Sequence, residues 1–528
     1  MSRPPSPDLR ALADFVTRLT GPKSPFALVM GQDGPQFVSG PQTLVEVYRR
    51  ARRMAAAPLV ILGDKAISYA EILEPGLALA GALRRRDLQG RRIAVDLEDK
   101  VEWLRWFVAI TAAGASAVLV PAQSGQGEVA VYLDAADCHL IVTRRDRPYA
   151  GVENLLGLTT TDAVEEWTLA PEAEALVAFT SGSTGVPKGV RHSQRGLLAG
   201  QKNMMLLGAV VGKLAVQPDA PPADARPTGA PTPLIVAPLS YVAGYSAFLL
   251  ALSTGGRIAL SQGVVTVEEA CALVERWALS SIVGAGDDFI RRLIRTPAAS
   301  SKLSSLRRLQ FHGAGLRTEI RREVAEALPD VQILTGYGLT ETCGAVASAP
   351  ARLVPDDAGG GWLSPGVAYR LAPADPTSGL PEAAGYLELR GEMVMLGYLN
   401  PVQNTAAFTP DGWFRTDDFC DVTDDGWLTV AERPRGLIGP EGAAAPRLML
   451  EAAIRDITGV DEAVVDALED GETLRVVVQA RAGQEISDIQ IVRALSERAL
   501  WTGPVLVEAR ETLPRTASGK LDRGRALS

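Results

Sequence analysis

The order of apolar and polar positions predicts alternating helices and strands in the first third of the chain. Residues 68–88 carry Leu and Ala at helical spacing, and residues 102–113 also read as a helix. Short apolar runs beside them predict strands at 92–96, 117–120 and 140–143. Strands that alternate with helices are typical of an α/β core with largely parallel strands. We therefore expect an α/β fold.

A second pattern begins where Pro434 and Gly436 interrupt regular structure. The elements expected after this point are strands at 463–467, 474–479 and 505–508 and helices at 448–458 and 486–499. Roughly a hundred residues with this content are typical of a small α+β domain. We therefore expect a large N-terminal domain, 1–431, and a small C-terminal domain, 432–528.

Composition excludes several classes of function. The chain has 528 residues, with 53 Lys and Arg against 62 Asp and Glu, and the net charge of −9 argues against nucleic acid as the main partner. Its three histidines are isolated and its four cysteines form no CxxC pair, so we expect neither a zinc site nor a disulfide framework. Scattered cysteines favour a reducing cytoplasm. The longest apolar run, 106–120, is too short to span a membrane, and no signal peptide is expected.

The strongest chemical signal is the stretch 175–190, which reads ALVAFTSGSTGVPKGV. A buried strand is expected to lead into a run of small residues, Thr180, Ser181, Gly182, Ser183, Thr184 and Gly185. Hydroxyl residues and glycines let backbone N–H groups surround an anion, and Lys188 adds a positive charge. The stretch is not a Walker A loop, because Pro187 precedes the lysine and an extended segment follows it.

Three further segments carry weaker signals. Residues 335–342, TGYGLTET, read as an exposed loop whose Thr340 and Glu341 can offer hard oxygen ligands to Mg²⁺. Residues 411–418, DGWFRTDD, place a carboxylate after an aromatic pair, where it can bind ribose hydroxyls or simply belong to a turn. Residues 513–523, LPRTASGKLDR, put a lysine on a glycine-containing loop, and such a lysine is usually a surface charge.

In this order and spacing, the four segments resemble the adenylate-forming superfamily of acyl-CoA synthetases, peptide-synthetase adenylation domains and luciferases. The resemblance covers the chain from about residue 58 onward; TSGSTGVPKG and PRTASGKLDR are its specific parts, and GYLN at 397–400 supports them. It implies a large N-terminal domain of layered α/β subdomains and a small mobile α+β C-terminal domain. It also implies that a carboxylic acid attacks the α-phosphate of ATP, giving an acyl-adenylate and pyrophosphate, and that a thiol then accepts the acyl group.

Carried over position by position, the resemblance implies the roles of individual residues. Residues 180–188 would hold the β- and γ-phosphates, Thr340 would contact the α-phosphate and Glu341 would bind Mg²⁺. Lys520 would bridge the α-phosphate and the incoming carboxylate. The ribose and adenine would be held by Asp418, Arg433, Gly313, Ala314, Gly315, Tyr337 and Gly338. An ionised carboxylate needs no histidine base, which agrees with the scarcity of histidine.

Two segments depart from the family's pattern. The hinge position, usually Asp or Lys, is Gly436, which still permits a wide change in φ and ψ. The segment that usually reads Gly-Gly-Glu and approaches pantetheine is EGAAA at 441–445, and Asp417 replaces the Gly expected before Asp418. These departures leave open whether CoA or the phosphopantetheine of a carrier protein accepts the acyl group.

Clues to the acid come from residues 238–245, PLSYVAGY. Peptide-synthetase domains carry an Asp here to bind an α-amino group, so its absence disfavours an amino acid substrate. Candidates for the acid pocket are Tyr241, Tyr245 and His312, each of which can equally be a core residue. No isolated cation stands out to pair a second carboxylate, so we expect a small monocarboxylic acid, either a fatty or an aromatic one.

Three functions remain open at this point. The first is an acyl- or aryl-CoA synthetase, an acid–thiol ligase. The second is an acyl-adenylate ligase that loads an acyl carrier protein or another acceptor. The third is a catalytically silent nucleotide-binding protein, which the joint presence of Lys188, Glu341, Asp418, Arg433 and Lys520 argues against. The role of residues 1–57 and the oligomeric state cannot be read from the sequence.

Overall fold

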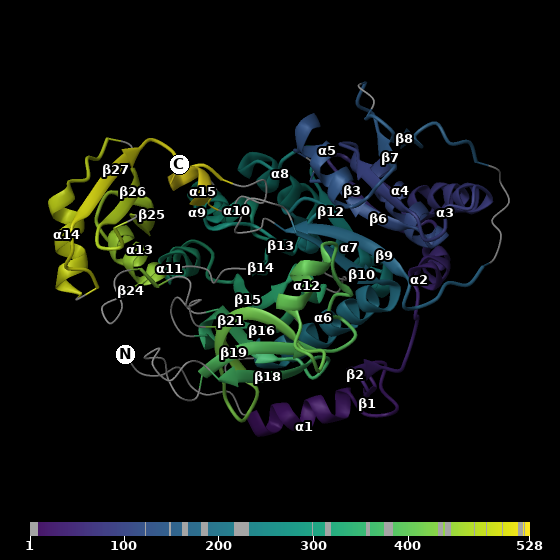
Figure 1. Ribbon diagram of the computed structural model, residues 1–528, viewed down its shortest axis with the longest axis horizontal. Helices are drawn as coiled ribbons and strands as arrows, with labels where there is room; N and C mark the ends of the chain where they lie inside the picture. Colours follow the sequence, from purple (N-terminus) through teal and green to yellow (C-terminus); the bar gives the residue numbers. More distant parts are fainter. Residues whose placement is uncertain are drawn as a thin grey trace. The chain divides into compact units, whose positions relative to one another are not determined.

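The structure is a computed structural model, and it describes residues 9–121, 123–146, 149–160, 167–180, 188–215, 232–297, 299–311, 318–354, 359–373, 384–430, 437–438, 445–468, 470–481, 483–498, 500–515, 521 and 523–527. The chain divides into two compact units (Figure 1). The first unit is Met1–Thr416 with Cys420–Thr429, and the second is Asp417–Phe419 with Val430–Ser528. The first is α/β and the second is α+β, so the expected fold class is confirmed.

A seven-stranded sheet of the first unit contains the strands expected from the early apolar runs. Its order is β20-β10-β9-β6-β5-β7-β8. Neighbours from β9 to β8 are parallel, whereas β10 runs antiparallel to both β9 and β20. The bounds are Arg92–Asp96 (β5), Ser116–Leu119 (β6), Leu140–Thr143 (β7), Glu153–Asn154 (β8), Glu174–Thr180 (β9), Lys188–Ser193 (β10) and Gly397–Tyr398 (β20). The three expected strands are therefore confirmed as β5, β6 and β7.

Helices α3 (Tyr69–Arg85) and α4 (Lys100–Ala113) pack against each other. The Ser68 hydroxyl accepts a hydrogen bond from the Glu71 backbone N–H, and the Glu71 carboxylate accepts one from the Ser68 N–H, so this capping box begins α3. Most side chains of α4 are buried, and β6 follows it directly. The apolar run 106–120 is thus a core helix followed by a core strand.

A thirteen-stranded sheet has a parallel part and an antiparallel part. Its order is β18-β19-β21-β22-β17-β16-β15-β14-β13-β11-β12-β3-β4. Neighbours from β15 to β3 are parallel, whereas the pairs β3–β4, β15–β16, β16–β17 and β18–β19 are antiparallel. The expectation of largely parallel strands therefore holds for only part of the core. The bounds are Pro58–Leu62 (β3), Lys65–Ser68 (β4), Pro233–Ile235 (β11), Ile258–Leu260 (β12), Ser281–Val283 (β13), Arg308–Gln310 (β14), Gln332–Leu339 (β15), Gly344–Pro350 (β16), Gly359–Leu363 (β17), Ala368–Pro373 (β18), Ala384–Arg390 (β19), Phe414–Val422 (β21) and Trp427–Val430 (β22).

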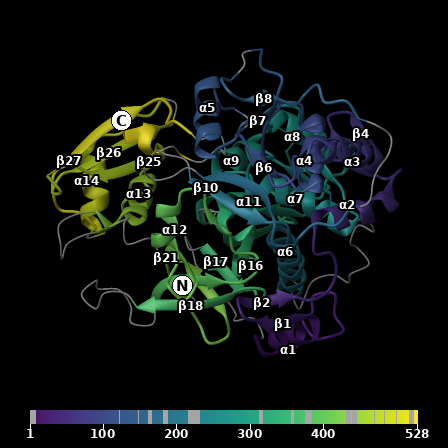
Figure 2. The ribbon, with the colours of Figure 1, turned by 45° about the vertical axis from the view of Figure 1, so that its right-hand side comes forward.

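The N-terminal residues pack on α6, the long helix Gln194–Ala215. Leu12 and Val16 of α1 (Leu9–Leu19) join Leu207 and Val210 of α6 in one buried cluster. A short hairpin of β1 (Leu28–Gly31) and β2 (Gly34–Phe37) lies beside α1 in both views (Figures 1 and 2). The other helices of this unit are Leu44–Ala51 (α2), Gln126–Ala135 (α5), Val242–Thr254 (α7), Val267–Trp277 (α8), Asp287–Arg295 (α9), Ala299–Lys302 (α10), Thr318–Ala327 (α11) and Pro401–Ala407 (α12).

The second unit is built on a three-stranded sheet. Its strands are β25 (Val460–Ala467), β26 (Leu474–Ala480) and β27 (Val505–Arg510), with β25–β26 antiparallel and β26–β27 parallel. Helices α13 (Arg447–Arg455) and α14 (Asp488–Glu497) share a buried apolar cluster with one face of this sheet (Figure 2). The short pair β23 (Leu437–Ile438) and β24 (Ala445–Pro446) precedes them, and α15 (Arg523–Leu527) follows β27. All three strands and both helices expected in this region are confirmed.

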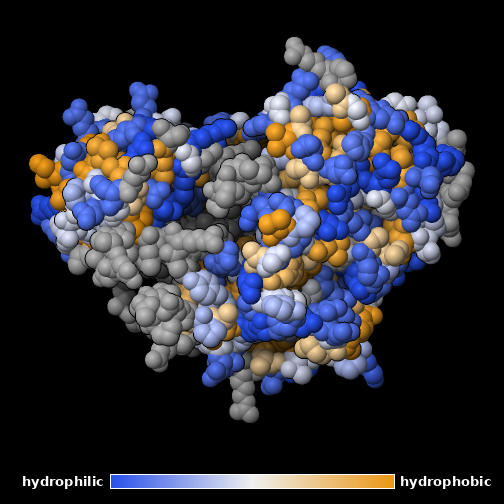
Figure 3. All heavy atoms as spheres, in the orientation of Figure 1, coloured by the Kyte–Doolittle hydropathy of each residue, from blue (hydrophilic) through white to orange (hydrophobic). Residues whose placement is uncertain are grey.

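The surface carries no large apolar face in the view of Figure 3, where exposed apolar side chains form small groups between charged ones. None of the described helices is both long enough and apolar enough to cross a membrane. All four cysteines are buried free thiols.

Candidate active site

The loop with the strongest sequence signal joins two antiparallel strands. β9 ends at Thr180 and β10 begins at Lys188, and these two residues stand opposite each other in the strand register. β9, β10 and α6 lie side by side in both views (Figures 1 and 2). The loop residues Ser181, Gly182, Ser183, Thr184 and Gly185 lie outside the described residues. The strand expected before this loop and the extended segment expected after it are both confirmed.

The segment 335–342 is not an exposed loop, and that expectation was wrong. Its first five residues belong to β15, and only Thr340–Thr342 forms a short 3₁₀ turn. Pairing with β16 buries Tyr337, and a Cβ at Gly338 would lie 2.2 Å from the Gly344 carbonyl oxygen. The glycine is therefore needed for the close approach of β16 rather than for a flexible loop. Thr340 and Glu341 are half-buried at the end of this strand.

Tyr398, to which the sequence analysis assigned no role, connects the first two segments. β20 pairs with the outer edge of β10, placing Tyr398 opposite Val190. The Tyr398 hydroxyl donates a hydrogen bond to Glu341 Oε1 at 2.8 Å, and Lys188 Nζ lies 5.3 Å from the centre of the Tyr398 ring. An ammonium at this distance from an aromatic ring is attracted by the ring's quadrupole. The GYLN segment was the only signal in the sequence for this contact.

The charges of this cluster suit a metal-bound polyphosphate. Within the described ranges, the Lys188 ammonium pairs with no carboxylate, and Glu341 Oε2 accepts no hydrogen bond. The same ranges hold no group of three or more His, Cys, Asp or Glu side chains that could bind a metal on their own. Mg²⁺ usually binds through one or two carboxylates and completes its shell with phosphate oxygens and water. One available carboxylate oxygen beside an unpaired cation fits that kind of site.

His192 contacts the turn that carries Glu341. It is buried on β10, and its Nε2 is 2.8 Å from the Thr340 carbonyl oxygen, while its Nδ1 is 3.0 Å from Cys343 Sγ. Burial lowers the pKa of His192 from 6.5 to about 4, because the charged imidazolium is poorly solvated there. The imidazole is therefore neutral at physiological pH.

This low pKa predicts a loss of stability in mild acid. The unfolded chain binds a proton at His192 below about pH 6.5, whereas the folded chain does not do so until about pH 4. The free energy of unfolding should therefore decrease as the pH falls from about 6.5 to 4, by about 2 kcal/mol at pH 5. Urea unfolding of the wild type and of His192→Gln at pH 7 and pH 5 measures this, and the variant should lose less stability.

His139 provides the matched control for that measurement. It is exposed, and its Nε2 lies 3.2 Å from the Asp137 carboxylate. His139→Gln should therefore keep the wild-type dependence of stability on pH. If His192→Gln and the wild type lose the same stability in acid, the low pKa of His192 is not the cause of that loss.

The remaining predicted residues are spread over the fold. Asp418 is buried on β21 and groups with the second unit. Asp417 before it has φ 58°, a left-handed conformation that Asp adopts at some cost and Gly adopts freely. A Gly, which was expected there, would adopt this conformation without that cost. Other predicted residues lie outside the described residues: His312, Gly313, Ala314, Gly315, Arg433, Gly436 and Lys520.

The two tyrosines proposed for an acid pocket occupy different environments. Tyr241 is half-buried and immediately precedes α7, whereas Tyr245 lies one turn inside α7 and is fully buried in the main apolar core. Within the described ranges the Tyr245 hydroxyl has no hydrogen-bond partner, and burial raises its pKa. Tyr241 is thus the more accessible of the two.

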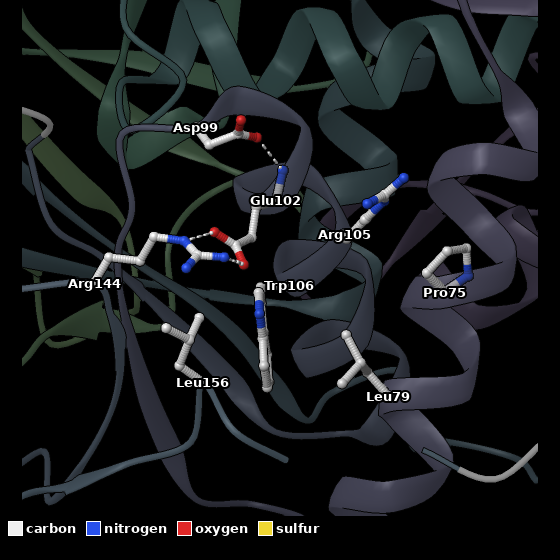
Figure 4. Close-up of a pocket in the computed structure, with 8 residues that line it drawn as sticks. All are labelled: Pro75, Leu79, Asp99, Glu102, Arg105, Trp106, Arg144 and Leu156. Atoms are coloured by element: carbon white, nitrogen blue, oxygen red, sulfur yellow. Dashed lines mark hydrogen bonds and ion pairs between the residues drawn. The ribbon is translucent and has the colours of Figure 1, made fainter. Parts of the chain in front are cut away.

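A surface cavity of about 600 Å³ shares no residue with the Lys188 cluster (Figure 4). Arg144 forms a bidentate ion pair with Glu102 on its wall, with N–O distances of 2.7 and 2.8 Å. Arg105 donates to the Glu71 carbonyl oxygen at 2.9 Å. Arg144 and Glu102 thus bind each other and Arg105 binds a backbone carbonyl, so these charges already have protein partners and the Lys188 cluster remains the candidate for chemistry.

Comparisons with known proteins identify the family of the chain and leave the choice of site residues untested. A family model described as "AMP-binding enzyme" matches residues 47–399. Among curated proteins, "4-coumarate--CoA ligase-like 6" of Oryza sativa subsp. japonica is 28% identical over 397 residues, which cover 71% of this chain and 66% of that protein. This chain thus matches slightly less than two thirds of that relative's length.

Two solved structures share the fold over most of the chain. One is O-succinylbenzoate Coenzyme A synthetase from Bacillus subtilis in complex with ATP and magnesium ion, with a TM-score of 0.74 and 21% identity, covering 91% of this chain and 99% of that one. The other is an amide bond synthetase from Marinactinospora thermotolerans, with a TM-score of 0.74 and 23% identity, covering 92% and 99%.

Proposed function

The chain belongs to the AMP-binding enzyme family, and from this premise we propose that it uses ATP to activate a carboxylic acid as an acyl-adenylate, with release of pyrophosphate. The observation that carries the proposal is the cluster of Lys188, Tyr398 and Glu341 at the end of the β9–β10 hairpin. Among the described residues, it joins a cation without a carboxylate partner to a carboxylate oxygen that accepts no hydrogen bond, as an ATP–magnesium site requires. Residues 1–431 would bind ATP and the acid, and residues 432–528 would carry Lys520.

The chain's own residues would bind and orient the reacting groups. Lys188 and the backbone of residues 180–188 hold the β- and γ-phosphates, and Glu341 holds Mg²⁺. Bound Mg²⁺ supplies positive charge to the phosphoryl oxygens. Thr340 contacts the α-phosphate, and Lys520 draws the substrate carboxylate toward it. The nucleophile is already ionised near neutral pH, so the neutral His192 is not required as a base.

The nucleoside would be held by other residues of the same assignment. Asp418 and Arg433 bind the ribose hydroxyls, while Tyr337 and Gly338 line the adenine slot together with residues 313–315. Burial of Tyr337 and the pairing of β15 with β16 hold Tyr337 and Gly338 in place. Side chains already held in place lower the entropy cost of ordering the substrate.

We propose CoA as the acceptor of the acyl group, which makes the chain an acid–thiol ligase. The curated relative named above is called a 4-coumarate–CoA ligase-like protein, and one of the two structures is called a Coenzyme A synthetase. The other structure is an amide bond synthetase, so the fold alone is compatible with more than one acceptor. The altered segment 441–445 favours the alternative, loading of a carrier-protein phosphopantetheine.

For the acid, we propose a small monocarboxylic acid, either a fatty or an aromatic one. Tyr241 supports this because its half-buried ring at the start of α7 is a suitable apolar wall for an acyl group. Residues 238–245 hold no carboxylate that could bind an α-amino group. We place the reaction in the cytoplasm, a proposal supported by the four buried free thiols.

The test is a pyrophosphate-release screen over fatty, aromatic and short-chain acids, with ATP and Mg²⁺. Release that depends on the acid supports adenylation, and its absence with every acid, although ATP still binds, would instead favour a silent nucleotide-binding protein. The same screen with CoA, or with a holo-carrier protein, identifies the acceptor. Faster turnover with CoA than with the carrier protein is the expected result.

A further inference from the structure

We propose that His192 is a positioning residue, which fixes the turn carrying Thr340 and Glu341 by donating a hydrogen bond to the Thr340 carbonyl oxygen. The inference rests on the proposed function, because it assumes that this turn holds the α-phosphate and Mg²⁺. His192 would touch neither of them. It would act through the backbone of the turn. Cys343 would favour the tautomer of His192 that carries its proton on Nε2 and can donate to Thr340.

The hydrogen bonds of the imidazole assign that tautomer. A carbonyl oxygen can only accept, so Nε2, at 2.8 Å from the Thr340 oxygen, carries the proton. Nδ1 is then an acceptor, and its neighbour at 3.0 Å is Cys343 Sγ, whose thiol donates to it. Both ring nitrogens are therefore satisfied inside the protein, as buried polar groups require.

His192 connects the turn to the strand that carries Lys188. The two residues are four positions apart on β10, so their side chains lie on the same face of the strand. Residues separated by 148 positions in sequence, His192 and Thr340, are thus joined directly. This bond fixes the distance between the Lys188 strand and the Glu341 turn.

The turn is held at other points as well, so removal of His192 should leave it folded. The Met395 N–H donates to the Glu341 carbonyl oxygen at 2.8 Å, and the Ser246 hydroxyl donates to the Cys343 carbonyl oxygen at 3.3 Å. Helix α6 approaches so closely that a Cβ on Gly200 would lie 2.7 Å from Cys343 Cβ. Loss of the imidazole should therefore loosen the Thr340 end of the turn rather than unfold it.

A purely structural histidine would behave differently from a positioning one. Loss of packing alone lowers stability and leaves the Mg²⁺ requirement of the folded enzyme unchanged. Loss of positioning raises the Mg²⁺ concentration needed for half-maximal activity, because Glu341 is no longer held in place. Removal of partners that orient metal ligands typically costs about 10- to 100-fold in metal affinity or activity.

The experiment measures acid-dependent ATP–pyrophosphate exchange against Mg²⁺ concentration for the full chain, with an acid found active in the screen. In His192→Leu we expect the half-maximal Mg²⁺ concentration to rise about tenfold, with a nearly unchanged KM for the acid. His192→Gln, whose amide can still donate to Thr340, should recover most of the wild-type response. His139→Gln should match the wild type.

A folded His192→Leu variant with the wild-type Mg²⁺ response would overturn the proposal. Should His192→Leu not fold, Cys343→Ala replaces it, since that variant keeps the imidazole but removes the thiol that selects its tautomer. We expect a smaller rise in the required Mg²⁺ in Cys343→Ala, and an unchanged requirement would again overturn the proposal. Absence of acid-dependent exchange in the wild type would instead contradict the proposed function, and this inference would fall with it.

Discussion

Replacement of Lys520 with alanine should leave the fold intact and reduce acid-dependent pyrophosphate exchange by at least about two orders of magnitude. The carboxylate and the α-phosphate are both anionic, and negative charge moves onto the phosphoryl oxygens as they react. A positioned ammonium that bridges the two offsets this repulsion and fixes the line of attack. Exchange kinetics measure the loss, and thermal unfolding shows whether the variant remains folded.

Lys213→Ala is the matched control, because it removes the same charge from an exposed position near the end of α6. It should retain the wild-type exchange rate. Addition of the acyl-adenylate itself should restore thioester formation to Lys520→Ala, since the proposed role of this lysine is confined to the first half-reaction. Near-normal pyrophosphate exchange in Lys520→Ala would contradict the proposal that Lys520 bridges the carboxylate and the α-phosphate.

The sequence predicted the elements whose apolar period is unambiguous. The strand β5 has the expected bounds, 92–96, and the second unit has its three strands and two helices where they were expected. Each of these elements has a regular apolar pattern and is bounded by turns, so the local pattern is sufficient to predict it. The antiparallel part of the large sheet was not expected, although its pairs β3–β4, β15–β16, β16–β17 and β18–β19 join strands that follow one another in the chain.

Segment 335–342 shows why composition misled the prediction. Two glycines and three threonines are typical of a loop, yet tertiary pairing with β16 makes most of this segment a buried strand. Gly338 is required by the approach of a neighbouring backbone, which no single-sequence pattern reveals. Only the last residues, Thr340 and Glu341, kept the expected position in a turn.

The candidate site also contains residues that local motifs predict and residues that only long-range contacts bring into place. Lys188 and Glu341 could be predicted because they belong to compact motifs. Tyr398 and His192 could not, because their functional contacts join residues 57 and 148 positions apart. Both contacts join the seven-stranded sheet, which holds β10 and β20, to the turn that follows β15 of the thirteen-stranded sheet. The structure thus adds the residues that hold the predicted ones in place.

Replacement of Glu341 with glutamine should reduce acid-dependent exchange by about two orders of magnitude and raise the Mg²⁺ concentration needed for half-maximal activity. The amide keeps the shape of the side chain and can still accept a hydrogen bond from Tyr398, so the lost property is the negative charge that binds Mg²⁺. Exchange assays over a range of Mg²⁺ concentrations measure both changes. Glu326→Gln, which alters an exposed carboxylate on α11, should have no effect.

Tyr398→Phe separates the charge of Glu341 from its orientation. It keeps the ring beneath Lys188 but removes the hydroxyl that donates to Glu341 Oε1. A hydrogen bond to a charged group contributes about 1.5–3 kcal/mol, and for the half-buried Glu341 we take the lower end of this range, about 1.5 kcal/mol. The expected loss is therefore about tenfold, smaller than in Glu341→Gln. An unchanged Mg²⁺ requirement in Glu341→Gln would show that this carboxylate does not bind the metal. A loss in Tyr398→Phe as large as in Glu341→Gln would mean that orientation, rather than charge, is what the site requires of Glu341.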